Sequence, residues 1–229
     1  MKYKWILFDA DETLFEFHSF QGLKNVMAKY NMDFTHDDYT AFQNINQPMW
    51  LAFQQQQVDV HTLKTQRFQH LSEKTGEDPL NLHNQLMTEM SLLSPALDGT
   101  LTTLEQLHQK VKMGIITNGF TSMQQPRLDL TKTSHFFDLL VISEEVGIPK
   151  PQSGIFTNAF EQMQQNGSLQ KKEILMVGDS LTSDIAGGNN FGFDTCWLNR
   201  HNAENHSEIK PTFEINNLTE LLPIVTLTY

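Results

Sequence analysis

Five short apolar segments recur along the chain, and each is rich in β-branched or aromatic residues. They are Trp5–Phe8, Val111–Ile116, Leu139–Ile142, Ile174–Val177 and Thr195–Leu198. Nearly continuous hydrophobicity in such short segments is typical of strands that are buried on both faces, as in a parallel sheet. The pattern therefore predicts five buried strands.

Helical spacing separates these predicted strands. Leu101, Leu104 and Leu107, for example, lie on one face of a predicted helix. Strands that alternate with helices favour an α/β fold whose crossovers are right-handed. We predict a Rossmann-like, doubly wound and mostly parallel sheet.

One long interval, residues 16–93, has no comparable apolar segment. Its pattern predicts helices instead, over Leu23–Tyr30, Asp37–Asn46, His61–Thr75 and Pro79–Leu92. We therefore predict two parts: an α/β core made of residues 1–15 and 94–229, and an α-helical cap of residues 16–93 inserted after the first strand.

Composition narrows the functional classes. The formal net charge is −11, whereas a nucleic-acid-binding protein normally carries a basic face. The single cysteine, Cys196, allows no intrachain disulfide, which fits a reducing compartment. No apolar run approaches the roughly 18 residues of a membrane span, and the one near residue 5 is too short for a signal peptide. We expect a cytoplasmic protein that binds neither nucleic acid nor membrane.

Polar and ionisable residues follow four of the predicted strands. They are Asp9 and Asp11 after the first, Thr117 and Asn118 after the second, Lys150 some residues beyond the third, and Asp179 and Asp184 after the fourth. Open α/β sheets bind their ligands beyond the carboxyl ends of the strands. We therefore expect these residues to meet at one edge of the sheet.

Several carboxylates at one place repel each other unless a divalent cation lies among them, and oxygen-only ligands favour Mg²⁺. Asp9 beside a bound phosphate would act as a nucleophile and form an aspartyl-phosphate. Thr117, Asn118 and Lys150 would bind the remaining phosphoryl oxygens. Taken singly, Asp9 also fits a helix N-cap, Asn118 a turn and Lys150 a surface position. The ordered set favours phosphate chemistry.

Other phosphate-binding and hydrolytic motifs are missing from the sequence. There is no G-x-x-x-x-G-K-[ST] of a P-loop, no glycine in the turn after the first strand, and no G-x-S-x-G elbow. P-loop NTPases, dinucleotide-binding enzymes and α/β-hydrolases are therefore disfavoured.

The ordered motifs resemble those of the haloacid dehalogenase superfamily: Asp9-x-Asp11-x-Thr13, then Thr117, Lys150, and Gly178-Asp179 with Asp184. The resemblance implies that Asp9 is the nucleophile and that Asp11 protonates the leaving oxygen and later activates water. It implies Mg²⁺ binding by Asp9, the Asp11 backbone carbonyl and Asp179, supported by Asp184. Dehalogenating members lack an acid/base Asp at the second position, so Asp11 favours phosphate chemistry.

Longer stretches are similar to a bacterial pyrimidine 5′-nucleotidase branch of that superfamily. They are residues 8–15, 114–121, 137–147 and 195–199. The resemblance implies a small phosphomonoester as substrate, namely a pyrimidine (deoxy)nucleoside monophosphate. Aromatic side chains stack on flat bases, and amides bind their edges. We accordingly predict substrate contacts from Phe15, Phe17, Asn46 and Trp50.

Two alternatives remain open at this point. The same core would serve a phosphatase or phosphomutase that acts on a sugar phosphate or another small phosphomonoester. A non-enzymatic receiver-like domain also uses acidic residues, Thr and Lys around a phospho-aspartate, but its acceptor follows a later strand. The sequence predicts no oligomeric state.

Overall fold

The computed structural model describes residues 1–165 and 167–226. The chain forms two compact units. An α/β unit comprises Met1–Glu16, Ala96–Gly119 and the chain from Thr131 onward, and a helical unit comprises Phe17–Pro95 and Phe120–Leu130. None of the helices in the described ranges has the length and apolar character needed to cross a membrane.

The α/β unit is built on a sheet of six parallel strands in the order β3-β2-β1-β4-β5-β6. The strands are β1 (Trp5–Phe8), β2 (Lys112–Thr117), β3 (Leu139–Ile142), β4 (Ile174–Gly178), β5 (Asp194–Leu198) and β6 (Phe213–Ile215). The predicted parallel α/β fold and its five strands are confirmed. Strand β6 was not predicted, because only one of its three residues is buried and it therefore has no apolar run.

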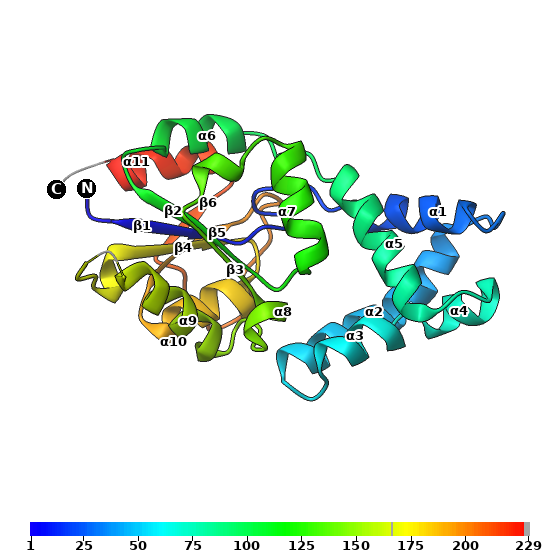
Figure 1. The fold of residues 1–229 in the computed structure, drawn as a ribbon. Helices are drawn as coiled ribbons and strands as arrows, with labels where there is room; N and C mark the ends of the chain where they lie inside the picture. Colours follow the sequence, from blue (N-terminus) through cyan, green and yellow to red (C-terminus); the bar gives the residue numbers. More distant parts are fainter. Residues whose placement is uncertain (166, 227–229) are drawn as a thin grey trace. The chain divides into compact units, whose positions relative to one another are not determined.

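Helices cover both faces of this sheet. They are α6 (Thr100–Leu107), α8 (Ser143–Val146), α9 (Ser153–Gln164), α10 (Ala186–Phe191) and α11 (Leu221–Thr226). Figure 1 shows α6 and α11 on one face, and α9 and α10 on the other. This layering explains why every residue of β1 and β4 is buried.

Strand β1 lies at the centre of the sheet, where Leu7 is paired with Gly114 of β2 on one side and with Met176 of β4 on the other. The chain extends the sheet from β1 towards β3 and then returns to place β4 on the opposite side of β1. Such a reversal of strand order is where open α/β sheets bind ligands, beyond the carboxyl ends of the strands. The reversal lies between β1 and β4, and Asp9 and Asp179 directly follow these two strands.

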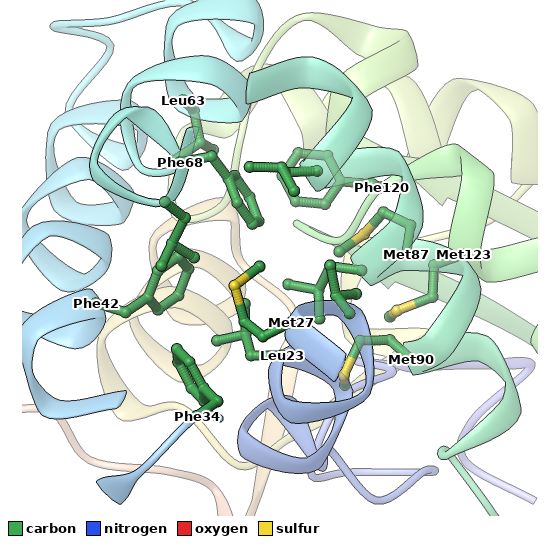
Figure 2. Packing of buried hydrophobic residues seen from close by; sticks show 14 of the residues in the cluster. Leu23, Met27, Phe34, Phe42, Leu63, Phe68, Met87, Met90, Phe120 and Met123 are labelled. Atoms are coloured by element: carbon green, nitrogen blue, oxygen red, sulfur yellow. The ribbon is translucent and has the colours of Figure 1, made fainter. Parts of the chain in front are cut away.

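The helical unit contains α1 (Ser19–Ala28), α2 (His36–Gln54), α3 (Val60–Gln66), α4 (Gln69–Thr75), α5 (Pro79–Leu92) and α7 (Thr121–Leu130). Its apolar core is rich in Phe and Met side chains, several of which Figure 2 shows packed together. The start of α2 is closed by a capping box, in which Thr35 Oγ1 accepts from the Asp38 N–H and the Asp38 carboxylate accepts from the Thr35 N–H. Such a cap supplies partners for N–H groups that a helix start leaves unpaired.

One segment lies in a different unit from the one predicted. We expected residues 94–229 to belong entirely to the core, whereas Phe120–Leu130 belongs to the helical unit. The physical reason is burial, since Phe120 and Met123 are part of the apolar core of that unit (Figure 2). Helix α7, which follows the predicted phosphate-binding turn directly, therefore packs with helices that come from the inserted segment.

The single helix predicted over His61–Thr75 is two helices, α3 and α4, that are interrupted at Arg67 and Phe68. Both of these side chains are buried. Arg67 is the C-cap of α3 and Phe68 is the N-cap of α4, so the chain changes direction between the two helices at these buried residues.

Candidate active site

The turn after β1 holds Asp9 rigidly. The Asp9 N–H donates to the Val177 carbonyl at 2.8 Å, which extends the pairing of β1 with β4 by one residue. The N–H groups of Leu14 and Phe15 both donate to the Ala10 carbonyl at 3.0 Å, which closes the turn. Within it Glu12 has a φ of 58°, a left-handed conformation that is uncommon for a residue with a side chain and that often marks functional turns.

Asn118 joins the end of β2 to the loop that carries Lys150. Its Oδ1 accepts from the Lys150 N–H at 2.8 Å, and its Nδ2 donates to the Lys150 carbonyl at 2.9 Å. Thr117 is buried, and its Oγ1 accepts from the Gly119 N–H at 2.9 Å. Asn118 thus fixes the backbone of Lys150, and its contact with phosphate stays a prediction.

The Lys150 ammonium group is 1% exposed and has three acceptors, which is the number of its hydrogens. They are Asp9 Oδ1 at 2.6 Å, Asp184 Oδ1 at 2.7 Å and the Ile116 carbonyl at 2.8 Å. The lysine therefore neutralises part of the charge of the carboxylates and sets the orientation of Asp9.

Asp179 and Asp184 are fixed by the turn after β4. The Trp197 Nε1–H donates to the Asp179 carbonyl at 2.8 Å. Asp184 accepts from the Ser180 N–H at 3.1 Å and from Ser183 Oγ at 3.2 Å, within the π-helical turn Leu181–Ile185. Gly178 is required here, because a Cβ atom at this position would lie 2.2 Å from Asp184 Oδ2.

Thr13 links two of the carboxylates, a role that the sequence did not predict. Its hydroxyl lies 3.4 Å from Asp9 Oδ2 and 3.4 Å from Asp179 Oδ1, and it accepts from the Asp179 N–H at 3.1 Å. In the sequence, only its place in the Asp9-x-Asp11-x-Thr13 motif indicated that Thr13 belongs to the site. The indole of Trp197 was also missed, because it belongs to an apolar strand.

Burial and mutual repulsion change the protonation of these acids. Burial, together with the charges of Asp184 and Asp11, raises the pKa of Asp9 to about 7, although Lys150 acts in the opposite direction. Burial and the charges of Asp9 and Asp184 raise the pKa of Asp179 to about 8. The pKa of Lys150 is raised because its carboxylate partners outweigh its desolvation. One lysine does not balance the negative charge of the cluster.

This cluster fits a hard divalent cation. Asp9, Asp179 and Asp184 each offer a carboxylate oxygen, and these oxygens lie within 4.8 Å of one another. Oxygen-only ligands at this separation suit Mg²⁺, whose positive charge would offset the repulsion that raises the two pKa values. The Asp11 side chain is not part of this group, and a ligand role for its backbone carbonyl stays a prediction.

The predicted substrate-contact residues lie in different settings. Phe15 has no exposed surface in the α/β unit, which argues against a direct contact with substrate. Phe17, at the start of the helical unit, is 39% exposed. Asn46 and Trp50 are half-buried on α2. The structure joins Asp9, Asn118, Lys150, Asp179 and Asp184 in one cluster. A substrate role for Phe15, Phe17, Asn46 and Trp50 stays a prediction.

Comparison with known proteins agrees with this geometry. The chain matches the haloacid dehalogenase-like hydrolase family over residues 3–192, and it belongs to that family. It is 42% identical over 221 residues to the pyrimidine 5′-nucleotidase YjjG of Escherichia coli, which covers 96% of this chain and 97% of that protein. It is 29% identical over 231 residues to the pyrimidine 5′-nucleotidase PynA of Streptococcus pneumoniae, covering 97% of this chain and 94% of that one.

The fold has a similar solved structure over nearly its whole length. The crystal structure of Bacillus subtilis YfnB bound to magnesium superimposes with a TM-score of 0.84 at 31% identity, covering 98% of this chain and 99% of that one. The resemblance to the haloacid dehalogenase superfamily inferred from the four motifs is therefore confirmed.

Proposed function

We propose that this hydrolase is a Mg²⁺-dependent phosphatase that acts through an aspartyl-phosphate on Asp9, and that its substrates are pyrimidine (deoxy)nucleoside 5′-monophosphates. The observation that carries the proposal is the buried cluster in which Asp9 is hydrogen-bonded to Lys150 and grouped with Asp179 and Asp184. The similarity to two relatives named as pyrimidine 5′-nucleotidases supports the substrate class.

In the first step, an Asp9 carboxylate oxygen attacks the phosphorus atom. A new P–O bond forms to Asp9, the P–O bond to the 5′ oxygen breaks, and Asp11 gives its proton to that oxygen. In the second step, Asp11 accepts a proton from water as the water oxygen attacks the phosphorus, which releases inorganic phosphate and regenerates Asp9. Thr117 and Lys150 bind the phosphoryl oxygens, on which charge accumulates in the transition state. For this, Lys150 exchanges one of its three acceptors for a phosphoryl oxygen.

Mg²⁺ would be held by Asp9, the Asp11 carbonyl and Asp179, with Asp184 in support. When bound, the ion supplies positive charge that screens the repulsion between a carboxylate and a phosphate dianion. Lys150 keeps the Asp9 oxygens oriented, and Asn118 keeps the Lys150 backbone in place. The proposed partner is thus a small phosphomonoester, with the protein acting in the cytoplasm.

The test is a panel of phosphomonoesters assayed for phosphate release with Mg²⁺ and with EDTA. We expect Mg²⁺-dependent release from dUMP and dTMP at a higher kcat/KM than from glucose 6-phosphate or ribose 5-phosphate. Turnover of the sugar phosphates in preference to the nucleotides would establish the alternative substrate class. Equal turnover in EDTA would refute the metal requirement, and a stable phosphoprotein without turnover would support the receiver-like alternative.

A further inference from the structure

The helical unit contains a buried cation that the phosphatase mechanism does not use. The Arg67 side chain, at the break between α3 and α4, is 4% exposed. It makes no ion pair with any residue in the described ranges. It donates hydrogen bonds to two neutral acceptors, Asn46 Oδ1 at 3.0 Å and His83 Nδ1 at 2.9 Å. A buried charge without a counter-charge is costly, so its position calls for an explanation.

Aromatic rings surround the guanidinium group. Its carbon lies 5.7 Å from the ring centre of Trp50, 5.0 Å from that of Phe68 and 5.1 Å from that of Phe120. Such rings stabilise a cation but accept few hydrogen bonds. The Nε–H of Arg67 has no acceptor in the described chain, and neither has Nε2 of His83. Donors therefore outnumber acceptors in this cluster, which we call the Arg67 cluster and define as Arg67, Asn46, His83, Trp50 and Phe120.

Arg67 also decides the orientation of the neighbouring amide. A guanidinium group has only hydrogens to offer, so Asn46 must turn its oxygen towards Arg67 and its Nδ2 away. Nδ2 donates one hydrogen to Gln43 Oε1 at 2.9 Å, and its second hydrogen has no acceptor among the described residues. Gln43 in turn donates its Nε2–H to the Tyr39 hydroxyl at 2.6 Å. Because Arg67 can only donate, it determines which atom is donor and which is acceptor in the hydrogen bonds from Asn46 to Gln43 and from Gln43 to Tyr39.

The amides and the indole lie on one face of α2. Tyr39, Gln43, Asn46 and Trp50 are three or four residues apart, and all four are half-buried. Trp50 offers a flat ring, and Asn46, one turn earlier, offers an N–H with no partner. This combination suits a planar ring that carries a hydrogen-bond acceptor, and it disfavours one that carries a donor at the same place.

Chain connectivity links this cluster to the phosphate chemistry. Phe120, whose ring packs against His83 at 4.5 Å and against Trp50 at 5.3 Å, follows Thr117 by three residues. The cluster therefore includes a side chain that is close in sequence to a predicted phosphate-binding residue.

We infer that Asn46 and Trp50 bind the nucleobase, and that Arg67, by holding the Asn46 oxygen and leaving an N–H of its amide free, makes this site selective for a keto oxygen at position 4 of a pyrimidine over an amino group. Arg67 is thus a positioning residue. The inference rests on the proposed function, since it requires a nucleotide substrate. Uracil and thymine carry the acceptor, whereas cytosine presents a donor to the same N–H.

The experiment compares kcat/KM for dUMP, dCMP and 2-deoxyribose 5-phosphate in the wild-type enzyme, Asn46→Asp and Arg67→Lys. Asn46→Asp keeps an acceptor for Arg67 but removes the N–H. We expect the preference for dUMP over dCMP to fall about tenfold, the effect of one lost hydrogen bond, with a smaller loss for the substrate without a base. Arg67→Lys, which cannot hold Asn46 and His83 together, should lower the same preference through KM rather than through kcat.

The matched control is Asn44→Asp, the same chemical change at an exposed position of α2, which should leave the preference intact. An unchanged dUMP-to-dCMP ratio in Asn46→Asp would overturn the inference, and so would equal losses on all three substrates, which would indicate a purely structural role. A wild-type enzyme that hydrolyses deoxyribose 5-phosphate but neither nucleotide would instead overturn the proposed function. The two failures are therefore distinguishable.

Discussion

Lys150 in the α/β unit and Arg67 in the helical unit are both buried cations, and their partners differ in charge. In the α/β unit, Lys150 is bonded to the carboxylates of Asp9 and Asp184. In the helical unit, Arg67 is bonded to a neutral amide and a neutral imidazole. As a consequence the pKa of Lys150 is raised by its acidic partners, whereas burial lowers the pKa of Arg67 to about 9.

The difference shows what each unit lacks. The group formed by Lys150 with Asp9, Asp179 and Asp184 has more negative than positive charges, so it is completed by a cation. The Arg67 cluster has a positive charge and spare donors, so it is completed by an acceptor. His83 adds no second positive charge, because burial and the nearby Arg67 lower its pKa to about 2 and keep it neutral, so that its Nδ1 accepts from Arg67. Both clusters therefore carry an unbalanced charge, which is negative around Lys150 and positive around Arg67.

The largest effect is expected from removing the nucleophile. Asp9→Asn should lower kcat by roughly 10⁴-fold or more, because an amide oxygen does not form the phosphoryl intermediate. Its effect on stability should be small or even favourable without Mg²⁺, because one of the mutually repelling acids is removed. Phosphate release and thermal denaturation of the metal-free protein measure the two. Substantial turnover by this variant would show that Asp9 is not the nucleophile.

The next largest effects are expected on stability, when each of the two buried cations is replaced in turn by a neutral side chain. Lys150→Met leaves Asp9 and Asp184 buried without a counter-charge, and it should lower the free energy of unfolding by about 3–5 kcal/mol near neutral pH. Arg67→Met leaves only neutral acceptors unpaired, and should cost about 1–3 kcal/mol. Urea denaturation in EDTA measures both.

If Arg67→Met proved as destabilising as Lys150→Met, the contrast between a compensated and an uncompensated cation would be wrong. Acidification supplies a control. Because protonation of the acids removes the uncompensated charge, the cost of Lys150→Met should shrink as the pH falls, whereas that of Arg67→Met should change little.

Magnesium affinity should depend on pH. The pKa values of Asp9 and Asp179 in the folded, metal-free protein lie near 7 and 8, above the value of about 3.9 for an unfolded Asp. Their ligand forms are deprotonated, so the apparent affinity for Mg²⁺ should rise at least about tenfold between pH 6 and pH 9. Calorimetric titration at several pH values tests this, and a flat profile would contradict it.

The same shifts fix the sign of the stability change in EDTA. Between about pH 4 and pH 8 the folded state holds protons that the unfolded state has lost, so the free energy of unfolding should fall as the pH rises through this range. In saturating Mg²⁺ this decline should be reduced, because the cation favours the deprotonated folded form. A decline of equal steepness with and without Mg²⁺ would mean that the ion binds elsewhere.

The smallest effect concerns the start of α2, the helix that carries Asn46 and Trp50. Thr35→Ala removes the capping hydroxyl and should cost about 1 kcal/mol of stability. Since Thr35 lies outside the Arg67 cluster, the preference for dUMP over dCMP should not change. Thermal denaturation and the nucleotide assay together show whether loss of stability alone alters selectivity.

Much of the α/β unit was predictable from the sequence. Strands buried on both faces require continuous apolar segments, so Trp5–Phe8 and Ile174–Val177 are visible without coordinates. The rule that ligands bind beyond the carboxyl ends of such strands then selects Asp9, Thr117 and Asp179. These features depend on local pattern and on sheet topology, which is why one sequence was sufficient to predict them.

Only the tertiary structure decided the features that depend on distant side chains meeting. Strand β6 has too little apolar surface for a pattern, and Phe120–Leu130 joined the helical unit because its apolar residues pack there. Arg67 gave no sign in the sequence, since arginines are mostly exposed. Its burial among rings, and the resulting orientation of Asn46, come from three separate segments of the chain, so no local pattern encodes them.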